Sequence, residues 1–152
     1  MRETFPRALD VTALEPYRLR IGWSTGETLD IDLAGKLKGV PALAHVLDPT
    51  VFAKARAGAH GLCIEWEDSE LGADNVYAWS REQAGQPSHE MFNAWMLRNR
   101  LSLSTAAVAL GLSRRMAAYY RTGARPLPRL VWLACLGWET QRPGRKDRAK
   151  AA

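Results

Sequence analysis

The amino-acid sequence predicts two modules: an α+β front module with a small antiparallel sheet and short helices, and an all-α back module. Apolar and polar residues alternate with the period of strands in the front part, whereas apolar residues recur at helical spacing in the back part. A polar stretch with a glycine and a proline separates the two. We therefore expect an α+β domain over 1–82, a linker over 83–90, a helical domain over 91–140 and a basic disordered tail over 141–152.

The charge is distributed unevenly between these modules. The chain has 152 residues with 21 Lys+Arg and 16 Asp+Glu, a formal net charge of +5. Residues 1–86 hold 9 basic and 13 acidic residues, a net charge of −4, and residues 87–152 hold 12 and 3, a net charge of +9. This asymmetry predicts a polyanionic partner for the back module. A basic tail that serves only solubility is the alternative.

Several classes of protein do not fit the composition. No apolar run approaches the ~18–20 residues of a membrane span, and the first residues lack the apolar stretch of a signal peptide. Two cysteines, Cys63 and Cys135, are too few for a disulfide framework or a structural zinc site. Both lie in apolar surroundings, so we expect reduced, buried thiols in a cytoplasmic protein without a membrane association.

A β-hairpin is the best-defined expectation for the front module. Residues 18–23 and 28–33 each alternate as half-buried strands do, and Gly26 between them is free to adopt a positive φ. The other expected elements are a weak strand over 10–14, a short helix over 41–47, a strand over 62–66, an acidic connector over 67–70 and a short helix or coil over 71–79.

In the back module, the segment from Leu101 to Gly123 fits two helices that meet at a tight turn. Ser102 and Ser113 are suited to cap the two helices, and Gly111 stands where the chain reverses and a positive φ is required. Small and aromatic residues at the spacing of one helical turn predict an inward face of Ala106, Ala107, Leu110, Ala117 and Tyr120.

The outer face of the second of these helices then carries Arg114, Arg115 and Tyr119. A helix whose first turn bears hydrogen-bond donors, held out from a small core, fits the major groove of DNA. The two arginines suit guanine edges or phosphates, and Tyr119 can reach a base, a sugar or a phosphate. Alanine-rich pairs of helices also occur in plain helical bundles, which is the competing interpretation.

The motif Leu110-Gly-Leu-Ser-Arg114, with Tyr120 and Gly123-Ala-Arg-Pro-Leu-Pro128, resembles the XRE (Cro/cI-type, lambda-repressor-like) helix-turn-helix over about residues 91–139. The resemblance implies an all-α lambda-repressor-like domain whose second motif helix enters the major groove. It implies that the base-facing residues are Arg114, Arg115 and Tyr119, and that the phosphate-facing residues are Ser102, Ser113, Arg121 and Arg125.

Two positions depart from the pattern of that family. Leu103 stands where the family often has Gln, so the side chain for one phosphate or base contact differs. Arg121 stands where it often has Glu, which adds positive charge toward DNA and changes how the helix end is fastened.

The front module is similar to a small prokaryotic domain of unknown function, the family numbered 2442. The similarity covers about residues 10–81 and rests on Tyr17–Trp23, Asp30–Leu33, Gly61–Trp66 and Asp74–Tyr77. It implies a small α+β sheet domain that in some members is joined to an XRE-type domain. Some members lie beside a toxin-like partner, which implies an antitoxin-like role.

Residues typical of enzymes do not form a recognisable constellation. His45, His60 and His89 are scattered, without metal-ligand spacing. Asp30 and Asp32 share one face of a strand, which we expect to be the solvated face of the hairpin. We expect no catalytic residue, metal or cofactor, and no enzymatic activity.

The sequence thus predicts a sequence-specific DNA-binding protein, a transcriptional regulator with an antitoxin-like, autoregulatory role as one form. One motif contacts about one half-site, so a homodimer on a pseudo-palindromic operator is expected. Trp132 and Trp138 lie six residues apart on the last helix, which predicts that one is exposed and available for a dimer contact. The alternative is a protein-interaction module, or an antitoxin, whose helical domain does not bind DNA.

Overall fold

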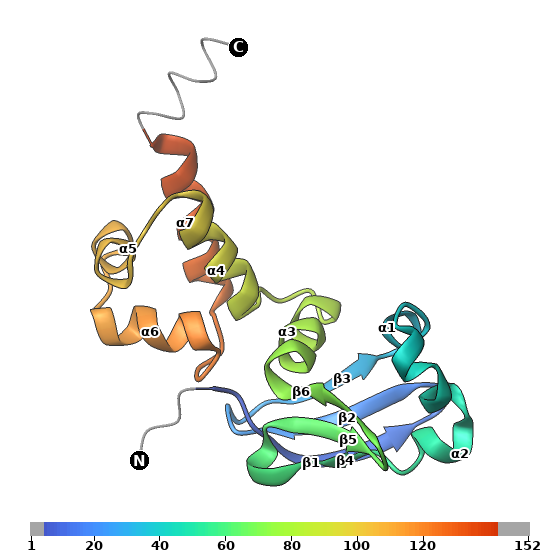
Figure 1. Cartoon of the computed structure of the whole chain (residues 1–152). Coiled ribbons are helices and arrows are strands. Elements are labelled where there is room, and N and C mark those ends of the chain that lie inside the picture. Colours follow the sequence, from blue (N-terminus) through green and yellow to red (C-terminus); the bar gives the residue numbers. More distant parts are fainter. Residues whose placement is uncertain (1–4, 143–152) are drawn as a thin grey trace, which may run out of the picture. The chain divides into compact units, whose positions relative to one another are not determined.

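The computed structural model describes residues 5–142, which fall into two compact units (Figure 1). The boundary between the units lies between Gln86 and Pro87. The segment between the units is shorter than the expected linker over 83–90. Helix α3 (Ala73–Gln83) includes residue 83, and α4 (His89–Arg98) begins at His89. Ser88 caps α4 by accepting a hydrogen bond from the Met91 N–H at 3.2 Å. Of the expected tail over 141–152, residues 143–152 lie outside the described residues.

Residues 5–86 form two three-stranded antiparallel sheets (Figure 1). In one sheet the strand order is β1 (Ala8–Leu14), β2 (Arg18–Trp23), β3 (Thr28–Asp32), and in the other it is β4 (Arg56–Ala57), β5 (Cys63–Trp66), β6 (Ser69–Gly72). The β2–β3 hairpin confirms the expectation from alternation, because Leu19, Ile21 and Trp23 are buried and Gly26 has φ 92°.

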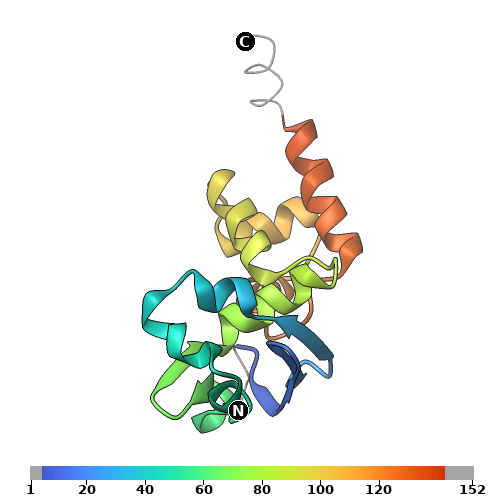
Figure 2. The same cartoon turned by 90° about the vertical axis from the view of Figure 1, so that its right-hand side faces the viewer.

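Short helices complete this unit (Figure 2). They are α1 (Ala34–Lys38), the 3-10 helix η1 (Pro41–Leu47), α2 (Pro49–Phe52), the 3-10 turn η2 (Ala59–Gly61) and α3. Helix α3 packs against β3, β5 and β6. Its Val76 and Tyr77 are buried in the same core as Trp23 and Trp66, so one apolar core holds both sheets together.

The acidic segment over 67–70 is not the connector that its composition predicts. Glu67 and Asp68 form a turn, whereas Ser69 and Glu70 belong to β6, where Glu70 lies opposite Glu65 of β5. This four-residue strand is not evident in the sequence because two acidic residues precede it and its own Glu70 is exposed. The helix expected over 71–79 starts later and extends further, to Gln83.

We predict that Gly61→Ala destabilises the first unit. Gly61 has φ 70°, and a Cβ there would collide with the backbone oxygen of Ala8 and lie 3.1 Å from its nitrogen. The left-handed conformation alone costs about 1–2 kcal/mol for a residue with a Cβ, and the collision must also displace β1. The thermal unfolding midpoint should fall by roughly 4–8 °C or more.

The matched control for this prediction is Gly35→Ala in α1. A Cβ at Gly35 meets nothing within 4 Å, so alanine should stabilise its helix by up to about 1 kcal/mol. Circular dichroism melts of the two variants measure the difference, and equal midpoints would contradict the tight packing of Gly61 against β1.

Residues 87–142 form four helices: α4, α5 (Leu103–Leu110), α6 (Arg114–Thr122) and α7 (Arg129–Gln141). Their core consists of the residues Phe92, Trp95, Met96, Ala106, Tyr120, Leu127 and Cys135. The longest helix in residues 5–142 is α7 with 13 residues, and no helix of that range has the length and apolar content to cross a bilayer.

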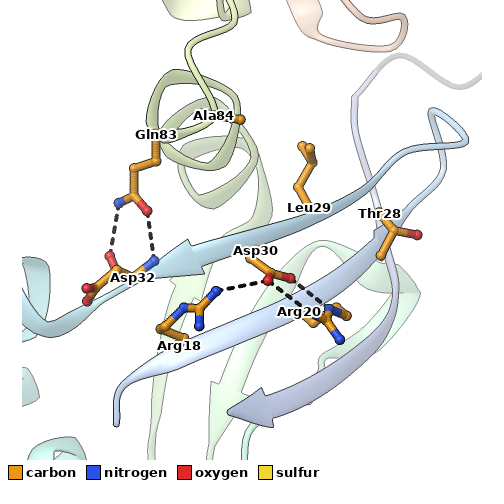
Figure 3. A pocket seen from close by; sticks show the side chains of 8 residues that line it. All are labelled: Arg18, Arg20, Thr28, Leu29, Asp30, Asp32, Gln83 and Ala84. Carbon is orange, nitrogen blue, oxygen red and sulfur yellow. Dashed lines mark hydrogen bonds and ion pairs between the residues drawn. The ribbon is translucent and has the colours of Figure 1, made fainter. Parts of the chain in front are cut away.

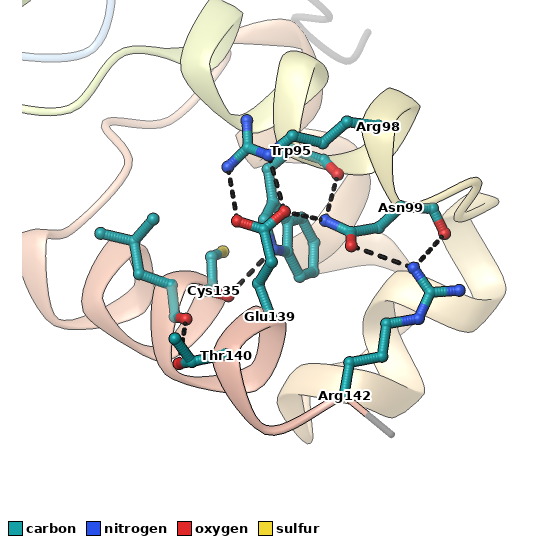
Figure 4. A network of polar contacts seen from close by, with 8 residues as sticks. Trp95, Arg98, Asn99, Cys135, Glu139, Thr140 and Arg142 are labelled. Carbon is teal, nitrogen blue, oxygen red and sulfur yellow. Dashed lines mark hydrogen bonds and ion pairs between the residues drawn. The ribbon is translucent and has the colours of Figure 1, made fainter. Parts of the chain in front are cut away.

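A polar network fastens the end of α4 to α7 (Figure 4). The buried Glu139 carboxylate accepts hydrogen bonds from Arg98 at 2.6 and 3.0 Å and from the Asn99 amide. Arg142 donates to the carbonyl and side-chain oxygens of Asn99, both at 3.0 Å. The hydrogen bond to Glu139 raises the pKa of Arg98. Glu139 therefore links α7 to the end of α4 and is not exposed to solvent.

The expectation of two reduced, buried cysteine thiols is confirmed in part. Both are free, and Cys135 is buried whereas Cys63 is half-buried. Burial raises the pKa of the Cys135 thiol to about 12, so it stays neutral at physiological pH.

The prediction that Trp132 or Trp138 is exposed is wrong. Both are half-buried and pack against the core, where the Trp138 ring meets the Trp95 ring edge-to-face at 5.6 Å. The two indole rings have the largest apolar areas on α7, so the helix turns them toward the core. The exposed large side chains of α7 are instead Leu130, Leu133 and Leu136.

Candidate nucleic-acid interface

Helices α5 and α6 meet at a turn whose geometry follows from two helix caps and one glycine. The Ser102 Oγ accepts from the Thr105 N–H at 3.1 Å, and the Thr105 Oγ1 accepts from the Ser102 N–H at 2.8 Å, so α5 begins with a capping box. Gly111 ends α5 with φ 69°, and the Ser113 Oγ accepts from the Met116 N–H at 3.1 Å. The expected caps and the expected turn glycine are confirmed.

The inward face of the pair holds α6 in place. Ala106, Ala107, Ala117 and Tyr120 are buried, as the spacing predicts, and Tyr120 packs edge-to-face on Phe92 with ring centroids 6.3 Å apart. Small residues at the contact let α5 and α6 approach closely. The first turn of α6 is consequently turned outward, and Arg114 and Arg115 are both exposed.

Tyr119 contacts two arginines, one on its own helix and one that follows the helix. The Arg115 Nε donates a hydrogen bond to the Tyr119 hydroxyl at 2.8 Å. The guanidinium carbon of Arg115 lies 5.5 Å from the centroid of the Tyr119 ring, and that of Arg125 lies 4.8 Å from it. Both distances are within the range of cation–π attraction. We call Arg115, Tyr119 and Arg125 the Tyr119 cluster.

The sequence selected all three members of this cluster but not their contacts. Arg125 follows α6 after a turn at Gly123, which has φ 82°, and only the folded turn brings its guanidinium back over the ring. An aromatic residue one helical turn after an arginine was the available signal for the Arg115–Tyr119 pair.

The remaining expected residues lie at the two ends of the helix pair. Ser102 and Ser113 are exposed, with their hydroxyls engaged as caps. Arg121 is exposed on the last turn of α6, and its carbonyl oxygen accepts from the Asn93 amide of α4 at 2.8 Å. Asn93, which the sequence did not single out, therefore fastens the helix end where a glutamate is frequent in the XRE family.

Positive charge around α6 is uncompensated. Residues 87–142 contain eight arginines and two glutamates. Arg98 and Arg142 bind Glu139 and Asn99, respectively. Within that range, no ion pair with a carboxylate engages the other arginines, namely Arg100, Arg114, Arg115, Arg121, Arg125 and Arg129. Unpaired guanidinium groups on an exposed face attract polyanions.

A pocket of about 530 Å³ in the first unit is lined by charges that bind one another (Figure 3). Asp30 accepts hydrogen bonds from Arg20 at 2.8 and 3.0 Å and from Arg18 at 3.0 Å. The hydrogen bond from Arg20 holds the pKa of Asp30 below its ordinary value. The Gln83 amide pairs with the backbone N–H and carbonyl of Asp32 at 2.8 and 3.0 Å. Asp30 and Asp32 thus lie where alternation predicts and are used structurally.

Strand pairing also gathers a group that the sequence did not reveal. Potential ligand atoms of Cys63, Glu65 and Glu70 lie within 4.8 Å of one another. Burial raises the pKa of the Cys63 thiol, and Arg56 donates to Glu65 at 2.7 Å. A protonated thiol and an already paired carboxylate are poor metal ligands, so this arrangement is explained by the β4–β5–β6 pairing.

The chain is similar to one solved protein over nearly its whole length. This is a crystal structure from Nitrosomonas europaea ATCC 19718, named as that of a "putative DNA binding protein". The two chains are 56% identical, the alignment covers 94% of this chain and 93% of the other, and the TM-score is 0.83. No family profile matches the chain, and no curated protein matches it either.

Proposed function

Because the chain belongs to the family of this Nitrosomonas europaea protein, we propose that it binds double-stranded DNA through α6 and regulates transcription. In the proposed complex, α6 lies in the major groove as the second helix of a lambda-repressor-like helix-turn-helix. Arg114, Arg115 and Tyr119 face the bases. The phosphate-facing residues are Ser102, Ser113, Arg121 and Arg125.

The observation that carries this proposal is the outward presentation of two arginines without carboxylate partners at the start of α6. Arg114 and Arg115 follow the Ser113 cap directly, and the buried Ala117 and Tyr120 fix the direction in which they project. Arginine is suited to bind guanine O6 and N7 with two hydrogen bonds. Such a helix start, without nearby carboxylates to occupy it, favours DNA because a recognition helix contacts base edges in the major groove through its N-terminal residues.

One helix pair of this size covers about one half-site, so we propose that two copies bind a pseudo-palindromic operator. The function of the first unit, including binding of a toxin-like protein, remains a prediction from its resemblance to the family numbered 2442.

Selection from a random pool of duplex DNA by the full-length chain tests the proposal. We expect enrichment of two related half-sites whose centres lie about one helical turn apart. Recovery of sequences without a shared motif, bound no more tightly than the starting pool, would favour a protein-interaction module instead.

The Tyr119 cluster leads to a prediction that separates support from direct contact. Tyr119→Phe keeps the ring below Arg125 and loses the hydrogen bond from Arg115, so affinity for the selected DNA should fall by about 2–10-fold. Tyr119→Ala also loses both cation–π contacts and should cost more, roughly 10–100-fold. Fluorescence anisotropy measures both variants. Equal losses would mean that the cation–π contacts of the ring contribute nothing to DNA binding.

A further inference from the structure

Helix α7 presents an apolar surface that the described part of the chain leaves exposed. Leu130 is 79% exposed and Leu133 is 52% exposed, and Ala134 and Gly137 are exposed between and after them. At 3.6 residues per turn these four positions follow one another along a single side of the helix. We call Leu130, Leu133, Ala134 and Gly137 the α7 stripe.

Gly137 is the informative member of the stripe. Glycine inside a helix is unfavourable relative to alanine, and a Cβ at this position would meet nothing within 4 Å among residues 5–142. Packing among the described residues therefore does not require a glycine here. A second helix that approaches closely from outside would require one.

We infer that the α7 stripe is the contact between two copies of this chain, with the two α7 helices antiparallel about a two-fold axis. An axis between residues 133 and 134 places each Leu130 against Gly137 of the other copy, and each Leu133 against its Ala134. Each large side chain then meets a small one. An interface formed by the same patch on both copies must be self-complementary in this manner.

The electrostatics of the helix also favour a second copy over other occupants. Residues 130–138 contain no charged side chain, so the stripe offers nothing to the phosphates of DNA. Both copies carry the same excess of arginine, yet the only basic side chain within α7 is that of Arg129, the first residue of the helix. An antiparallel pair places the two Arg129 side chains at opposite ends of the contact, which keeps these like charges apart.

The size of the surface predicts a weak dimer. Helix α7 spans about 20 Å at 1.5 Å per residue, and a contact of two such helices falls at the low end of specific interfaces. Two half-sites on one DNA would hold the copies close together and raise their effective concentration. The role of this dimer rests on the proposed function, which requires a second copy on the DNA. The dimer itself can be observed without DNA.

Sedimentation equilibrium of the full-length chain without DNA tests the interface. We expect a reversible monomer–dimer equilibrium that Gly137→Leu and Leu133→Gln each weaken by about tenfold or more. Leu97→Gln on α4 is the matched control, because Leu97 is 80% exposed but lies outside the stripe, and it should leave the equilibrium unchanged. Circular dichroism melts confirm folding, and Gly137→Leu should raise the midpoint because leucine is the better helix former.

The outcomes separate this inference from the proposed function. A chain that is monomeric at every concentration up to several hundred micromolar, or a dimer that both stripe variants leave unchanged, would overturn the inference. Where DNA binding holds, the stripe variants should keep their affinity for a single half-site and lose cooperative binding to two. If DNA binding fails while the stripe variants still dissociate the dimer, the proposed function falls and the interface stands.

Discussion

Arg114→Ala combined with Arg115→Ala should lower affinity for the selected DNA by about 10²–10⁴-fold, the largest effect expected of any surface change. Each arginine that binds a base with two hydrogen bonds contributes about 1–3 kcal/mol. Both are exposed at the start of α6 and take no part in the core, so the fold should be unaffected. Fluorescence anisotropy at several salt concentrations measures the change.

Salt dependence shows which kind of contact is lost. Each phosphate contact contributes about 0.9 to the slope of log affinity against log salt. The loss of contacts to bases should therefore lower affinity with only a small change in this slope. Arg100→Ala is the matched control, since it removes an exposed arginine of the same unit that lies outside α6 and outside the α7 stripe. Unchanged affinity and slope in the double variant would rule out groove reading by α6 and favour the protein-interaction alternative.

Trp95→Ala should unfold the second unit while the first stays folded. The Trp95 side chain is fully buried, packs on Phe92 at 5.5 Å and Trp138 at 5.6 Å, and donates from Nε1 to the Cys135 carbonyl at 2.9 Å. Truncation of such a residue costs about 3–5 kcal/mol. That is a large part of the 5–15 kcal/mol that typically stabilises a domain.

Two-dimensional amide NMR spectra measure this effect unit by unit. We expect the signals of residues 87–142 to collapse and those of residues 5–86 to persist, because each unit has its own core. Leu97→Ala, at an 80% exposed position of the same helix, should change neither set. A simultaneous loss of both sets would show that the units do not fold independently.

Features specified by neighbouring residues were predictable from the sequence. The caps Ser102 and Ser113 and the turn glycine Gly111 act within a few residues of their own position. The β2–β3 hairpin likewise follows from alternation around a short turn. This is why the start of α6, and with it Arg114 and Arg115, could be placed from the sequence.

Features that depend on contacts across the chain were not predictable. A glutamate near the end of a helix is ordinarily exposed to solvent. Glu139 is instead buried, because Arg98 and Asn99, 41 and 40 residues earlier, donate hydrogen bonds to it. The stacking of Arg125 on Tyr119 requires the folded turn after α6. Strand β6 contains one acidic residue, Glu70, and follows Glu67 and Asp68, and no local pattern indicates its pairing with β5.

Repeated selection with single variants tests most directly whether α6 reads bases. Arg114→Ala should lose the preference for one base at one position of each half-site, with the other positions unchanged. Arg125→Ala, at a residue proposed to face phosphate, should lower affinity about equally for all sequences and reduce the salt slope by about 1. If Arg114→Ala instead weakens every sequence equally and leaves the selected motif intact, then α6 does not read the bases.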